Sequence, residues 1–108
     1  MNINELRINN LISHRGLICT VEIINGELNE IYFLGEDFYH SDKPENLEGV
    51  PLTEEWILKF EKVSWINKDI LGIFYWFNGE KKYILFVHSF QNTYFELTGK
   101  ELTSTKAN

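Results

Sequence analysis

The sequence predicts a small α+β fold, in which two antiparallel β-hairpins form a small sheet or a partly open barrel packed by two helices, at about 53–62 and 87–98. Two Asn-Gly dipeptides, the pair that most readily takes positive φ in a hairpin turn, each lie between apolar and aromatic runs. A capped helix start lies mid-chain, and apolar residues recur at helical spacing near the end. A chain of 108 residues can bury one core. We therefore expect a single domain over 1–108, with a polar tail that frays from about 100 to 108.

The first hairpin is expected to join residues 17–24 to residues 28–34 through the first Asn-Gly pair. A two-residue loop would place Val21 opposite Glu30, whereas a three-residue loop places Val21 opposite Ile31. The second register collects apolar side chains on one face, so we expect it in the fold. That face would consist of Cys19, Val21, Ile23, Ile31 and Phe33.

The clearest helix start of the chain follows Pro51. Thr53 can cap the helix, and the two glutamates after it lie where the helix macrodipole favours negative charge. Trp56 and Phe60 then share a face, because they are four residues apart. These signals predict the helix at about 53–62.

The second hairpin is expected around the second Asn-Gly pair, with Phe74 opposite Tyr83 across a two-residue turn. Its return strand runs into a segment with apolar residues at helical spacing, which predicts the helix at 87–98. Gly99 suits the position after a helix end, where the backbone turns left-handed.

The second hairpin is also unusually aromatic. Tyr75, Trp76 and Phe77 lie opposite Lys81 and Lys82, an arrangement that could stack the bases of a single-stranded nucleic acid. Consecutive strand residues alternate faces, so at least half of these rings are expected in the core. We take Tyr75 and Phe77 as candidate partner-binding residues.

Negative charge is concentrated between Glu27 and Glu55, where nine acids stand against Lys43, a balance of −8 within a total of −6. The part of this segment from 35 to 50 has no periodicity and is expected as a long ordered loop that can hold a short strand. Such a surface repels a phosphate backbone and attracts a basic partner, so direct nucleic-acid binding is not expected. Alternatively, these acids only keep an aromatic-rich domain soluble. The candidate partner-binding acids are Glu36, Asp37, Asp42, Glu45 and Glu48.

Residues that could catalyse a reaction or hold a metal are scattered through the sequence. The three histidines lack metal-ligand spacing, and nothing places a base beside Cys19. We therefore expect a protein that is not an enzyme, with no catalytic residue, metal or cofactor. The first residues show no basic segment followed by an apolar run, so a signal peptide is not expected, and no apolar stretch approaches the roughly 20 residues of a membrane helix. A monomer or weak homodimer in the cytoplasm is predicted.

Three blocks of the sequence resemble a family of small proteins carried by bacterial phages and prophages: ELRINNLI at 5–12, VPLTEEWILKF at 50–60, and VHSFQNTYFELTGKEL at 87–102. The sequence departs from the family pattern after Phe60, where Glu61-Lys62 replaces a usual Gly-Phe. It also has Asn9 where glycine is common, and the acidic segment has no fixed counterpart in the family. The resemblance implies a phage-encoded accessory protein and assigns no catalytic residue.

Among such proteins, the chain looks like a type VI-B anti-CRISPR, which implies inhibition of an RNA-guided RNase, or of its complex with guide RNA, in a bacterial host. CRISPR nucleases hold guide RNA in basic channels, which an acidic surface can occupy by the same electrostatics. Two alternatives stay open. One is a phage structural or assembly accessory, and the other is a small nucleic-acid-binding module that uses the aromatic hairpin.

Overall fold

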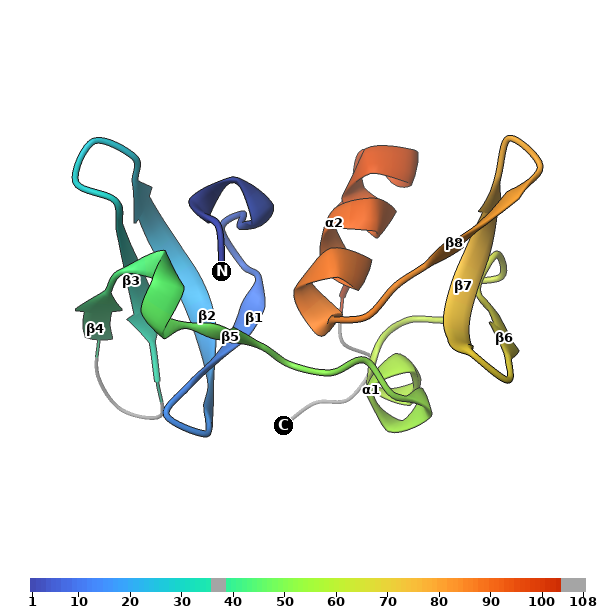
Figure 1. The fold of residues 1–108 in the computed structure, drawn as a ribbon, viewed down its shortest axis with the longest axis horizontal. Coiled ribbons are helices and arrows are strands. Elements are labelled where there is room, and N and C mark those ends of the chain that lie inside the picture. The colour runs from blue at the N-terminus through green and yellow to red at the C-terminus, as the bar shows by residue number, and fades with distance from the viewer. Residues whose placement is uncertain (36–38, 104–108) are drawn as a thin grey trace. The chain divides into compact units, whose positions relative to one another are not determined.

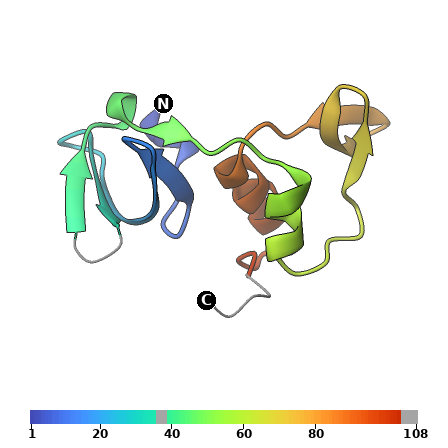
Figure 2. The ribbon, with the colours of Figure 1, turned by 90° about the horizontal axis from the view of Figure 1, so that it is seen from below.

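The computed structural model describes residues 1–35 and 39–103. The chain divides into two compact units, Met1–Val50 (the first unit) and Pro51–Asn108 (the second unit), and each is described by itself (Figures 1 and 2). The predicted α+β class is confirmed by a five-stranded antiparallel sheet in the first unit, and by a three-stranded sheet and two α-helices in the described part of the second. The two hairpins belong to these separate sheets, and neither sheet closes. The expectation of one domain over 1–108 stays a prediction.

The first unit is built around one antiparallel sheet with the strand order β4-β3-β2-β1-β5. A buried cluster on one face of this sheet includes Ile12, Val21, Ile31 and Phe33, each fully enclosed. The segment expected as a long loop contains two short strands and a 3-10 turn, η2 (Pro44–Asn46). The strands of the unit are β1 (Leu11–His14), β2 (Leu17–Asn25), β3 (Glu30–Leu34), β4 (Tyr39–Asp42) and β5 (Glu48–Gly49).

A β-bulge in β2 sets the register of the first hairpin. The pairing shifts between Val21 and Ile23, so Val21 lies opposite Phe33 and the expected pairing with Ile31 is wrong. The other predicted core residues of this hairpin are buried, but Ile23 is 57% exposed. Because a bulge adds one residue to a strand, Ile23 emerges on the face opposite to Val21.

The turn of this hairpin is longer than expected. Residues 26–29 separate β2 from β3, and the left-handed backbone conformation falls on Asn29, with φ 51°, rather than on Gly26. The Asn25 side chain accepts a hydrogen bond from the Leu28 backbone N–H at 3.1 Å. Asn25 thus closes the turn through its side chain, as asparagine commonly does.

The second unit contains a three-stranded sheet with the order β6-β7-β8. The predicted pairing of Phe74 with Tyr83 is confirmed, and the two-residue turn has positive φ at both Asn78 and Gly79. Phe90 of α2 is fully buried, and its ring meets that of Phe60 edge-on at 5.9 Å between centroids. The elements are α1 (Glu54–Lys59), β6 (Asn67–Asp69), β7 (Gly72–Phe77), β8 (Glu80–Tyr83) and α2 (Val87–Thr98).

Both helices have the predicted ends, apart from an early stop of α1. The Thr53 hydroxyl accepts a hydrogen bond from the Trp56 backbone N–H at 3.3 Å. Trp56 and Phe60 lie on one side as expected, with their rings stacked at 6.3 Å between centroids, although α1 ends at Lys59 rather than at 62. Gly99 takes the left-handed conformation, with φ 73°, directly after α2.

The segment after α2 is attached to the unit as far as Thr103, whereas a fraying tail was expected from about 100. Leu102 is buried, and the Thr103 backbone carbonyl accepts a hydrogen bond from the Glu61 N–H at 2.9 Å. The Glu61 carboxylate accepts in turn from the Thr103 hydroxyl at 3.2 Å. Residues 104–108 lie outside the described part of the chain.

Candidate partner-binding surfaces

The two units differ sharply in charge. The first unit holds nine carboxylates and three basic residues, a balance of −6, whereas the second unit holds seven of each. The entire net charge of the protein therefore belongs to the first unit. A cationic partner is attracted to this unit at long range, and the second unit adds no net attraction.

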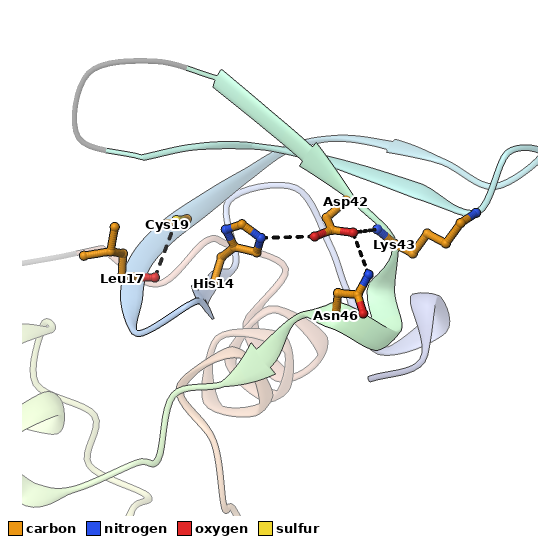
Figure 3. Close-up of polar contacts among 6 residues, drawn as sticks. All are labelled: His14, Leu17, Cys19, Asp42, Lys43 and Asn46. Atoms are coloured by element: carbon orange, nitrogen blue, oxygen red, sulfur yellow. Dashed lines mark hydrogen bonds and ion pairs between the residues drawn. The ribbon is translucent and has the colours of Figure 1, made fainter.

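Asp42, at the end of β4, is held in a network of hydrogen bonds (Figure 3). Its carboxylate accepts from the Asn46 side-chain amide at 2.7 Å and from the Lys43 backbone N–H at 2.8 Å, and it lies 3.1 Å from His14 Nε2. These bonds lower the pKa of Asp42 to about 2, and the bond from Asn46 makes the largest contribution. The carboxylate thus joins β1, β4 and η2 to one another. Its predicted role in a partner surface stays a prediction beside this internal role.

The other candidate acids do not share this network. Glu45 is exposed on η2, and its carboxylate lies 3.4 Å from the Asn29 side-chain amide. Glu48 is exposed on β5, opposite Ser13 of β1. Glu36 and Asp37 lie outside the described residues. Within the described part of the unit, the acids are therefore distributed around the sheet.

The two candidate aromatic residues of β7 have different surroundings. Tyr75 is half-buried, and its ring meets Trp65 edge-on at 5.7 Å between centroids. Trp65 also stacks on Tyr94 of α2 at 6.3 Å, so Tyr75 belongs to the packing of the second unit. Phe77 is exposed, opposite Glu80 of β8.

A cluster of side chains that contact one another, which was not predicted from the sequence, lies on the other face of this hairpin. Lys81 Nζ lies 4.5 Å from the centre of the Phe74 ring and 5.7 Å from that of Trp76. Asp69 Oδ2 is 2.9 Å from Lys81 Nζ and accepts from the Tyr83 hydroxyl at 2.6 Å. These contacts lower the pKa of Asp69 to about 2, and the bond from Tyr83 makes the largest contribution. One feature of the sequence could have indicated the role of Asp69. Asp69 lies three residues before Gly72, a pattern typical of turns in which the aspartate side chain accepts hydrogen bonds from backbone N–H groups.

This cluster does not suit a nucleic-acid site. Lys81 is paired with Asp69, and Lys82 Nζ lies 3.3 Å from the Glu80 carboxylate. Affinity for a phosphate backbone needs lysines or arginines that are not neutralised by neighbouring acids. The lysines of the aromatic hairpin therefore offer little net positive charge to RNA or DNA.

Groups with potential for catalysis are engaged in packing or hydrogen bonds. Cys19 is buried, which raises the pKa of its thiol, and its Sγ donates a weak hydrogen bond to the Leu17 carbonyl at 3.5 Å (Figure 3). Among residues 1–35 and 39–103, no group of three or more His, Cys, Asp or Glu side chains could hold a metal ion. A pocket of about 420 Å³ in the second unit has walls of mixed polar and apolar character, and its charged side chains, Glu54 and Lys68, form an ion pair with each other.

No helix in the described part of the chain is long and apolar enough to cross a membrane. No protein-family model, curated protein or solved structure matches this chain.

Proposed function

We propose that this protein acts by binding a basic protein partner through its first unit. We further propose that the partner is the RNA-guided RNase of a type VI-B CRISPR system, which the protein inhibits in the cytoplasm of a bacterial host. The observation that carries the proposal is the placement of the whole net charge of −6 in Met1–Val50. An RNA-guided nuclease is basic where it holds RNA, so its channel complements this unit.

The environment of the titratable groups supports binding rather than catalysis. Two carboxyls with a pKa of about 2, Asp42 and Asp69, are held ionised by hydrogen bonds that connect structural elements. A general acid or base requires a pKa near the working pH instead. The one cysteine is a buried thiol with a raised pKa, which disfavours the reactive thiolate.

The proposal is tested by measuring binding of the wild-type protein to a purified type VI-B nuclease, with and without guide RNA, together with RNA cleavage. The informative variant replaces Glu45 and Glu48 with Gln, and Asp42 is left in place because it holds the unit together. A matched variant of the second unit replaces the exposed acids Glu80 and Glu96 with Gln. Both variants lose two negative charges from the protein as a whole.

We expect the Glu45/Glu48 variant to associate roughly threefold or more slowly than wild type at low salt, with the difference shrinking as salt rises. The Glu80/Glu96 variant should associate at nearly the wild-type rate, because it leaves the charge of −6 on the first unit unchanged. A wild-type protein that neither binds the nuclease nor slows cleavage would refute the proposed partner. Equal slowing by the two variants would refute the assignment of the interaction to the first unit.

A further inference from the structure

The outer face of the five-stranded sheet, opposite the buried cluster of the first unit, includes three rows of side chains that cross the strands, beside the polar pair Asn25–Glu30. The strand pairing defines the rows as Glu48–Ser13–Ile18, Leu11–Thr20–Leu34–Tyr39 and Ile23–Tyr32–Ser41. The opposite face carries the buried residues Ile12, Cys19, Val21, Ile31 and Phe33.

The outer face carries more apolar side chains than is usual for the solvent-exposed face of a sheet. Ile18 is 45% exposed, Ile23 is 57% exposed and Tyr39 is 65% exposed, and half-buried Leu34 lies between the two edges of this area. An antiparallel sheet with one solvated face normally alternates apolar and polar side chains along each strand. β2 instead places two exposed isoleucines, Ile18 and Ile23, on the outer face, one on each side of Thr20. The bulge contributes to this pattern, because it turns Ile23 outward.

The charged side chains on the strands of this sheet are all negative, whereas Arg15 and Lys43 lie in the connections next to the strands. The five strands contain four carboxylates and no lysine or arginine. Glu48 ends the first row, and Glu30 lies beside the third row, where its carboxylate accepts a hydrogen bond from the Tyr32 hydroxyl at 3.2 Å. A second copy of the chain would bring like charges to these acids, which disfavours self-association through this face.

We infer that the outer face of the β4-β3-β2-β1-β5 sheet is the partner-binding surface, and that it takes a protein segment with an apolar centre flanked by lysine or arginine. Ile18, Ile23 and Tyr39 contact the apolar centre, while Glu30 and Glu48 face the flanking cations. This inference rests on the proposed function for the identity of the natural partner. The chemistry of the occupant follows from the sheet itself.

The test uses a probe that does not depend on a nuclease. A fluorescein-labelled peptide with a central Leu-Thr-Leu-Thr-Leu segment and two lysines at each end is titrated with the full-length protein, and binding is measured by anisotropy. A second peptide carries glutamate in place of every lysine. The variant Ile18→Thr/Ile23→Thr/Tyr39→Thr removes the apolar centre and keeps residues that favour strands. The control variant Ile70→Thr/Leu71→Thr/Leu85→Thr removes three exposed apolar side chains of the second unit.

We expect the lysine peptide to bind wild type and the control variant alike, and to bind the triple variant of the outer face at least tenfold more weakly. Binding should weaken as salt rises, and the glutamate peptide should not bind. If the triple variant loses its folded circular dichroism spectrum, Tyr39→Thr alone, on an edge strand, provides the comparison. A lysine peptide that fails to bind, or that binds the outer-face variant as tightly as wild type, overturns the inference.

The same variants separate this inference from the proposed function. Peptide binding as expected, with no binding of the nuclease, leaves the outer face assigned and refutes the proposed partner. Inhibition of the nuclease by wild type and by the outer-face variant to the same extent overturns the inference and leaves the proposed function standing.

Discussion

His14 of β1 and Asp42 of β4 lie on strands that do not pair with each other, yet His14 Nε2 is 3.1 Å from Asp42 Oδ2. The Asp42 carboxylate also accepts a hydrogen bond from Asn46 of η2, so that it contacts both β1 and η2 (Figure 3). Asp42 therefore connects segments that the backbone hydrogen bonds of the sheet leave separate.

The network predicts that the first unit loses stability in acid through Asp42. The pKa of Asp42 is about 2 in the folded protein, below its ordinary value of 3.8, so folding favours the ionised carboxylate. Its contribution is therefore present above about pH 5 and is lost as the pH falls toward 2. Asp42→Asn should lower the melting temperature at pH 7 and flatten this dependence, as measured by amide NMR signals of β1 and β4. Glu27→Gln, in an exposed turn, is the control and should leave both unchanged.

The cap of α1 predicts a smaller and more local effect. Thr53→Ala removes the acceptor for the Trp56 N–H and should lower the free energy of unfolding by about 1 kcal/mol. Thr53→Ser keeps the hydroxyl and should stay close to wild type. Urea unfolding followed by tryptophan fluorescence suits this test, because all three tryptophans belong to the second unit. Equal stability of the alanine and serine variants would contradict the capping role.

The Asp69 cluster predicts a shifted tyrosine. The hydrogen bond to Asp69 raises the pKa of Tyr83 above its ordinary value of 10, because the neutral phenol donates this bond and would lose it on ionisation. Asp69→Asn should remove this effect, so that one tyrosine ionises at lower pH in a spectrophotometric titration. Glu80→Gln, on the same hairpin, should not change the titration. A titration curve unaffected by Asp69→Asn would show that the Tyr83 bond is not maintained in solution.

The features predicted correctly from the sequence are those that a few neighbouring residues decide. Thr53 caps α1 and Gly99 ends α2 as expected, because both need only local hydrogen bonds or backbone freedom. The second hairpin has the expected register, since Asn78 and Gly79 provide both positive φ angles of a two-residue turn.

The features that the sequence did not reveal depend on residues far apart in the chain. The bulge in β2 lies within the stretch that pairs with β3 and just past Thr20, the last residue in the ladder with β1, and no local pattern records it. The bonds of Asp42 to His14 and of Asp69 to Tyr83 likewise join distant residues. Of the candidate acids, Asp42 therefore could not be recognised as a structural residue before its neighbours were known.

The bulge also gives the chain one position where its length can change without moving the core. Val21 pairs with Phe33 and Ile23 pairs with Tyr32, so Glu22 is the residue without a counterpart on β3. A homologue one residue shorter at this point would keep every one of these pairings, with Ile23 still on the outer face. A deletion elsewhere in β2 would instead exchange the faces of the residues between it and the bulge. A one-residue deletion in β2 should therefore be tolerated during evolution at Glu22 before any other position of the strand.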